Sequence, residues 1–207
     1  MLVIIIGLIV GTLAALGPLG FLASPAQHLS NALVSMGTHI ATTLTHSATP
    51  KTQSIVTALA AALMPAIVAA GLLLAARCSH AARRIVAVVA VVVAITGLIV
   101  LPGSQAAVVV VTCLVVIVVS FFVSTAASLF FAFCGAYLAT ATIHSLWQTS
   151  PTTKLHTAAL TLSHYVTISA SSIQLILSAL IGLICLTAVV STLRGTTPTP
   201  PTPSSQT

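Results

Sequence analysis

Long apolar runs dominate the chain, and short polar or proline-containing segments separate them. A helix needs roughly 20 apolar residues to cross the hydrocarbon core of a bilayer. Pro102-Gly103-Ser104 is a strong turn signal between two runs, and Pro65 should kink the run in which it lies. The pattern predicts an all-α, polytopic membrane helix bundle with about six spans, at about 1–23, 54–76, 85–101, 106–123, 124–146 and 172–193.

The run from Ala106 to Leu146 allows two interpretations, because it has 41 residues and neither charge nor proline. One helix of that length would extend about 62 Å, which is twice the core thickness of about 30 Å. A break within the polar cluster 120–128 gives two helices and six spans. Against the break, small residues recur every four positions from Ser120 to Thr140, and only one long helix would keep that stripe continuous, which leaves five spans.

Two polar-patterned segments lie between apolar runs and open with Ser24-Pro25 and Ser150-Pro151. Ser is a favoured helix cap and Pro a favoured first helical residue. Apolar residues then recur at helical spacing, with Ser, Thr, Asn and His elsewhere: Leu29, Leu33, Met36, Ile40 and Leu44 in the first segment, and Leu155, Ala159, Leu162 and Val166 in the second. We expect two amphipathic helices that lie at the membrane interface.

Composition narrows the class further, since 58% of the residues are hydrophobic and only 3% are charged. Soluble domains carry about 25% charged residues, so soluble and disordered proteins are excluded. The chain has no Asp or Glu. Paired-carboxylate catalysis, Ser–His–Asp triads, HExxH zinc sites, Mg²⁺-nucleotide sites and EF-hands therefore lack an essential residue. We predict that the protein is not an enzyme and has no cofactor.

All six formal charges are Lys or Arg, and they serve best as topology signals. With six spans, all the arginines fall on one side of the membrane and Lys51 and Lys154 on the other. The arginine side is then cytoplasmic or equivalent to it, in a bacterial inner membrane or an organellar or cellular membrane. Both termini lie on that side. The arginines are Arg77, Arg83, Arg84 and Arg194.

The seven histidines raise the question of a metal site. Neutral imidazoles bind Zn²⁺ and Cu²⁺, but His28 and His39 on one helix would lie about 16 Å apart, too far to share a metal. Only residues of different segments could converge, and the weak candidates are His39, His46 and His164. The simpler interpretation places these rings on the polar faces of interfacial helices, so no metal site is predicted.

Stripes of small residues are the strongest positive signal. In lipid the hydrophobic drive between helices is weak, so close approach of backbones carries their association. Three stripes are predicted to be packing faces: Gly7, Gly11 and Ala15; Ala58, Ala62, Ala66 and Ala70; Ser120, Ser124, Ser128, Ala132 and Ala136. The stripes alone do not say whether their partner lies in the same chain.

These features favour a single transmembrane helical domain, residues 1–195, followed by a disordered Thr/Pro/Ser-rich tail, residues 196–207. We expect a structural or assembly subunit of a larger membrane complex. Its partners would be the bilayer and other membrane-protein subunits or a second copy of the chain, and not nucleic acid. The alternative is a small channel or facilitator for a neutral solute, gated by histidine and lined by the Ser/Thr stripe.

Overall fold

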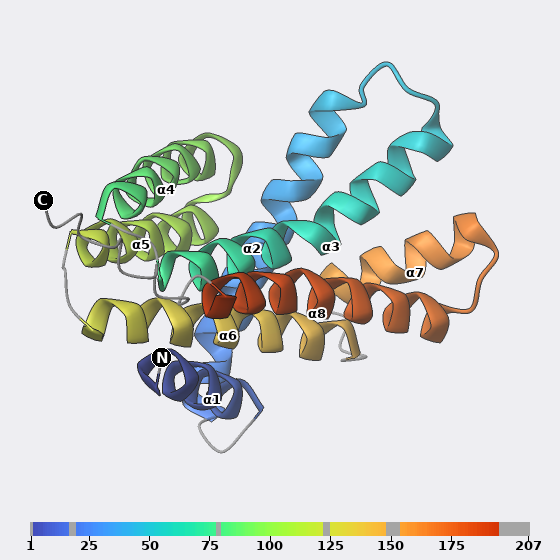
Figure 1. Ribbon diagram of the computed structural model, residues 1–207. Helices are drawn as coiled ribbons and strands as arrows, with labels where there is room; N and C mark the ends of the chain where they lie inside the picture. The colour runs from blue at the N-terminus through green and yellow to red at the C-terminus, as the bar shows by residue number, and fades with distance from the viewer. Residues whose placement is uncertain (1, 17–19, 78–79, 122–124, 148–153, 195–207) are drawn as a thin grey trace, which may run out of the picture.

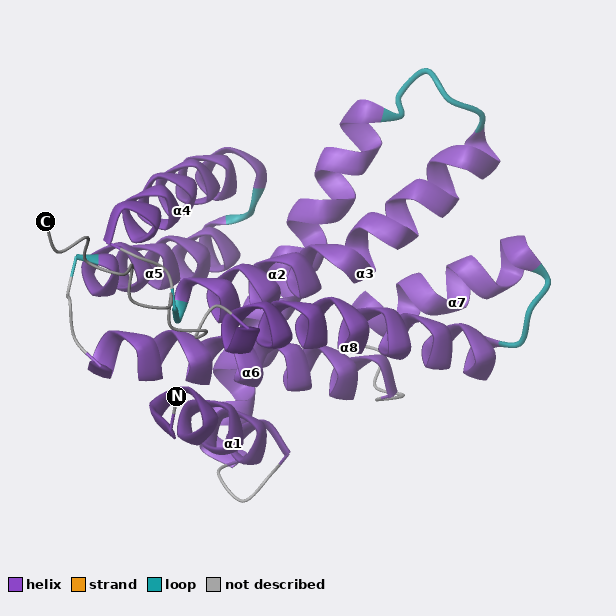
Figure 2. Cartoon of the chain, viewed as in Figure 1, coloured by secondary structure: helices purple, strands orange, loops and turns teal. Residues whose placement is uncertain are grey.

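The computed structural model describes residues 2–16, 20–77, 80–121, 125–147 and 154–194. Within these ranges the chain forms eight α-helices and no strand, as Figures 1 and 2 show. The all-helical class predicted from the sequence is confirmed. The helices are α1 Leu2–Leu16, α2 Gly20–Leu44, α3 Pro50–Ala75, α4 His80–Val100, α5 Gly103–Ser120, α6 Thr125–Trp147, α7 Lys154–Val166 and α8 Ala170–Arg194.

Four of these helices, α3, α5, α6 and α8, are long and apolar enough to cross a membrane. They coincide with four of the six segments predicted as spans. Helix α1 has only 15 residues, which is about 22 Å, and the apolar part of α4, Arg84–Val100, is also shorter than the four.

The predicted span 1–23 is wrong as a single helix. Helix α1 ends at Leu16, and α2 begins at Gly20 and runs through Ser24-Pro25 to Leu44. Residues 17–19 lie outside the described ranges. The segment that the sequence predicted to open at Ser24 is part of a helix that begins at Gly20.

Helix α2 does not lie on the outside as the predicted interfacial helix would. It crosses the bundle obliquely and contacts α1, α3, α4, α5, α6 and α7 (Figure 1). The consecutive residues Ala32, Leu33 and Val34 are all buried, so more than one face is covered. Two of its hydroxyls bond to the helix itself, since Ser35 donates to the Asn31 carbonyl at 2.8 Å and Thr38 to the Ser35 carbonyl at 2.7 Å. The hydroxyl of Ser30 is also buried and has no partner within the described ranges.

Helix α7 does have one covered side. Leu155, Ala159 and Leu162 are buried, whereas Leu160 and His164 are exposed. It packs against α2, α3, α6 and α8. Three of the four positions of the predicted apolar face are therefore buried under other helices of this chain, and the fourth, Val166, is exposed.

The apolar run 106–146 forms two helices, as in the six-span interpretation. Helix α5 ends at Ser120 and α6 begins at Thr125, with residues 122–124 outside the described ranges. Helix α5 packs on α4 and α2, whereas α6 packs on α1 and α3. Both helices also contact α2, and a cavity lies between them.

Candidate functional site: helix interfaces and a lateral cavity

The closest helix interface joins α1 to α6 and uses glycine on one side and alanine on the other. A Cβ atom added at Gly7 would lie 2.8 Å from the Cβ of Ala132. One added at Gly11 would lie 2.5 Å from the Phe133 carbonyl oxygen and 3.1 Å from the Cβ of Ala136. No side chain fits at either position without a shift, so the absence of a Cβ allows the backbones to meet.

Two of the small-residue stripes predicted from the sequence thus face each other within the chain. Gly7 and Gly11 lie against Ala132 and Ala136, and Ala15 is buried near Ala141 further along the same interface. The stripe of α3 is also internal, because all four of its members are buried: Ala58, Ala62, Ala66 and Ala70.

The third stripe is divided by the break between α5 and α6. Ser120 ends α5, is buried, and donates to the Val116 carbonyl at 2.7 Å. Ser124 lies outside the described residues, and Ser128, Ala132 and Ala136 belong to α6. The spacing of four residues therefore marks a continuous face only along α6, where it is covered by α1.

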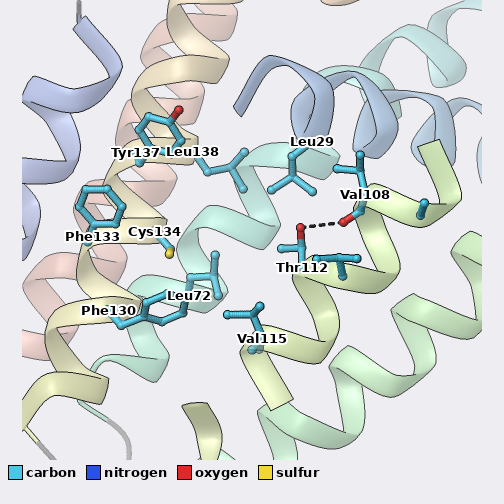
Figure 3. A pocket seen from close by; sticks show the side chains of 13 residues that line it. Leu29, Leu72, Val108, Thr112, Val115, Phe130, Phe133, Cys134, Tyr137 and Leu138 are labelled. Carbon is cyan, nitrogen blue, oxygen red and sulfur yellow. Dashed lines mark hydrogen bonds between the residues drawn. The ribbon is translucent and has the colours of Figure 1, made fainter. Parts of the chain in front are cut away.

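A cavity of about 510 Å³ lies between α5 and α6, and α2 and α3 contribute to its lining (Figure 3). The lining is almost entirely aliphatic or aromatic. Its hydroxyl from α5 is satisfied, since Thr112 donates to the Val108 carbonyl at 2.8 Å. The lining residues are Leu29, Leu72, Ala107, Val108, Val111, Thr112, Val115, Val116, Phe130, Phe133, Cys134, Tyr137 and Leu138.

Side-chain size explains why this side of α6 stays open. Helix α5 presents Val111 and Val115 to the space, and α6 presents Phe130, Phe133 and Tyr137. The rings of Phe133 and Tyr137 stack with centroids 5.8 Å apart and planes 8° from parallel. Branched and aromatic side chains hold backbones further apart than Gly and Ala do, so the wall of α6 is bulky and rigid.

The candidate histidines do not come together. His39 is exposed on α2, His46 is exposed in the turn that follows, and His164 is exposed on α7, edge-on to the ring of Tyr165 at 5.7 Å. Across the described ranges, no three His, Cys, Asp or Glu side chains are placed to share a metal ion.

A polar cluster that the sequence analysis did not identify joins the C-terminal end of α6 to α7 and α8 through hydrogen bonds. The side-chain amide nitrogen of Gln174, on α8, lies 3.0 Å from the Leu146 carbonyl oxygen and 2.9 Å from Nδ1 of His156, on α7. The amide donates to the carbonyl, since a carbonyl only accepts. Nδ1 of His156 also lies 3.3 Å from the same Leu146 oxygen, so the three groups form one cluster.

A second bond reinforces the same junction, because Trp147 Nε1 donates to the Ser178 hydroxyl at 3.0 Å. Gln174 is buried, and a buried amide needs partners. The sequence feature that could have indicated this cluster was a glutamine inside an otherwise apolar span. Its partner His156 is 18 positions away and on another helix, so sequence spacing could not identify the pair.

The predicted topology residues lie near helix ends. Arg77 follows α3 and is half-buried, Arg84 is exposed near the start of α4, Arg83 belongs to the first turn of α4, and Arg194 ends α8. The last turns of α3 and α8 and the first turn of α4 lie toward the same end of the bundle (Figure 1). Four arginines are therefore attached to helix ends that share one end of the molecule.

No protein-family model matches the chain, and neither a curated protein nor a solved structure resembles it significantly.

Proposed function

We propose that the protein is a non-enzymatic integral membrane protein that serves as a structural or assembly subunit of a larger membrane complex. Four long apolar helices support a membrane location. Large aliphatic side chains also cover the outside of the bundle, for example Ile9 on α1, Ile95 on α4 and Leu183 on α8, each more than half exposed. Water would not tolerate such a surface, and lipid would.

The membrane topology that fits these helices best has six crossing segments: α1, α3, α4, α5, α6 and α8. Helix α1 is shorter than the usual core, and a bilayer thins locally around a short helix at modest cost. With six crossings, both termini lie on the side of Arg77 and Arg194, which the positive-inside rule assigns to the cytoplasm or its equivalent.

The observation that carries the subunit role is the apolar cavity beside α6. It is lined by Phe130, Phe133 and Tyr137, which are three of the nine aromatic residues in a chain with six Phe, two Tyr and one Trp. Aromatic side chains are enriched at the centres of protein interfaces because they bury a large area at low entropic cost. A partner's apolar transmembrane helix is therefore the occupant that we propose.

Less supports the alternative of a channel along the Ser120–Thr140 stripe. Ser120 and Thr140 donate to carbonyls of their own helices at 2.7 and 2.8 Å. Ala132 and Ala136 lie against α1. A polar path along this face would have to separate α1 from α6 first.

Site-specific photo-crosslinking in the native membrane tests the proposal. A photoreactive residue at Val115, which lines the cavity, should give one crosslinked product of defined mass that contains a second polypeptide. The same residue at Leu114, which is exposed on the adjacent face of α5 and does not line the cavity, is the matched control. Filling the cavity with Cys134→Phe should abolish the Val115 product. Crosslinks from Val115 to lipid alone would contradict a subunit role for this face.

A further inference from the structure

A second cavity, of about 380 Å³, lies between α2, α3 and α7, and its wall is more polar than that of the cavity beside α6, although most of the surface it exposes is apolar. Seven of its ten lining residues carry a hydroxyl or an amide, and the other three are alanines. Helices α2 and α7 each contribute two threonines, and α3 contributes Gln53, Ser54 and Thr57. Thr157 is exposed, so the cavity opens to the outside.

Most of the hydroxyl protons in this lining are already used. Thr42 donates to the His39 carbonyl at 2.9 Å, Thr161 to the Thr157 carbonyl at 3.0 Å, and Ser54 to the Pro50 carbonyl at 2.9 Å. A hydroxyl has one proton and two lone pairs, so each of these oxygens can still accept. The wall therefore offers mainly acceptors, with the Gln53 amide as a group that can both donate and accept.

One hydroxyl in the lining lacks a hydrogen-bond partner among the described residues. Oγ1 of Thr57 is shielded from solvent and has no hydrogen-bond partner in the described part of the chain. A shielded polar group without a partner costs free energy. That oxygen is shielded even from water, so a solute in the cavity would reach it only after the lining shifts.

Charge decides the class of solute. The chain has no Asp or Glu and a net charge of +6, and Lys51 lies in the first turn of α3, two positions before Gln53. A cation would find no counter-charge and would be repelled. An anion would need several free donors, but Thr42, Ser54 and Thr161 donate to their own helices, which leaves mainly the Gln53 amide in the open part of the wall. A neutral molecule with several hydroxyl donors matches both conditions.

We propose that this cavity binds a small neutral polyol. Its volume lies within the range of about 300–1,000 Å³ that is usual for small-molecule sites. The polyol's hydroxyl protons would bond to the lone pairs of Thr42, Ser54 and Thr161, and its carbon skeleton would rest on Ala58 and Ala61. The site is formed by this chain alone and does not depend on the subunit role.

Direct binding to the purified full-length chain in lipid nanodiscs tests the proposal, with sorbitol as the probe and saturation-transfer NMR as the readout. Thermal shifts are unsuitable because osmolytes are excluded from protein surfaces and stabilise many proteins without a site. Sorbitol should receive saturation from the protein. Dimethoxyethane has ether oxygens and no donor, so it should not, and neither it nor choline should displace sorbitol.

The variant Thr42→Val/Thr161→Val removes two acceptors from the wall and keeps the side-chain shape. It should weaken sorbitol binding about five- to tenfold or more. Thr96→Val is the matched control, because Thr96 makes the same bond to its own helix, to the Val92 carbonyl at 2.8 Å, and lies on α4, away from the cavity. Its binding should equal that of the unaltered protein.

Three results would each overturn the proposal. The first is no transfer to sorbitol from the unaltered protein, and the second is equal transfer to sorbitol and dimethoxyethane. The third is equal binding by the double variant and Thr96→Val. The comparison of the two probes needs no substitution, so it decides the question even if the double variant fails to fold.

Discussion

Helix α6 has two sides that pack in opposite ways. Toward α1, the positions of Gly7 and Gly11 bring backbone within contact distance of Ala132 and of the Phe133 carbonyl. Toward α5, Phe130 and Val115 line a space of about 510 Å³. The same helix is thus held tightly by the first helix of the chain and left open toward the helix that directly precedes it.

On helix α6, the size of the side chains separates the side that packs closely from the side that does not, whereas the sequence neighbours α4 and α5 do pack on each other. Between apolar helices in lipid there is little hydrophobic drive, so association depends on close contact. On the side of α6 that faces α1, glycine and alanine four residues apart allow this close contact. On the side that faces α5, valine and phenylalanine prevent it, and they leave an apolar surface for a partner from outside the chain.

The largest expected effect comes from adding side chains to the closed side. The variant Gly7→Ala/Gly11→Ala places one Cβ 2.8 Å from Ala132 and another 2.5 Å from a backbone oxygen of α6. Overpacking typically costs about 1–3 kcal/mol per site, so we expect the free energy of unfolding to fall by about 3 kcal/mol. Unfolding in mixed micelles, followed by helical circular dichroism, measures it.

The matched control is Gly71→Ala/Gly182→Ala, on α3 and α8. A Cβ at either position meets no atom within 4 Å. Alanine is the better helix former by up to about 1 kcal/mol per site, so this variant should be as stable as the unaltered protein or more stable. Equal losses in both double variants would mean that glycine matters here for reasons other than the α1–α6 contact.

The sequence predicted which faces of the helices pack better than it predicted which helices contact each other. The spacing of Gly7 and Gly11 identified a packing face, because neighbours on a helix face are set by sequence alone. That this face meets Ala132 and Ala136 depends on how helices far apart in the chain are placed. The lateral cavity was missed for the same reason, since it is a property of two helices that stay apart.

Polar residues misled the prediction for α2. Its Ser and Thr residues suggested a solvent-exposed polar face, so the segment was expected at the membrane interface. In the fold, Thr38 and Ser35 bond to carbonyls of their own helix, so they need no water. A hydroxyl on a helix is therefore weak evidence for exposure, whereas a buried glutamine such as Gln174 needs a partner that only the fold reveals.

A smaller effect is expected where polar bonds hold the end of α6. Gln174→Leu removes the amide that bonds to the Leu146 carbonyl and to His156. The Leu146 carbonyl and the His156 ring both lose the amide as a partner, so we expect a loss of about 1–2 kcal/mol in the free energy of unfolding. The same mixed-micelle measurement applies.

Gln105→Leu, near the start of α5, tests the opposite case, a glutamine whose side-chain oxygen has no partner within the described ranges. The Oε1 atom of Gln105 is shielded from solvent and has no partner within the described ranges. Its removal should leave stability unchanged or raise it, since no bond is lost and an unsatisfied oxygen disappears. If Gln105→Leu proved as harmful as Gln174→Leu, the bonds at the end of α6 would not explain the cost.

The smallest effect on stability is expected from filling the open side. The side chain of Cys134 lies among the residues that surround the cavity in Figure 3, and Cys134→Phe would occupy part of that space. Cavity filling commonly adds about 0.5–2 kcal/mol, and the lower end applies because the cavity is not enclosed. Leu114→Phe, which adds a ring outside the cavity, should change nothing. A loss for Cys134→Phe as large as that for the paired glycine variant would show that both sides of α6 are closed, and the contrast between them would fail.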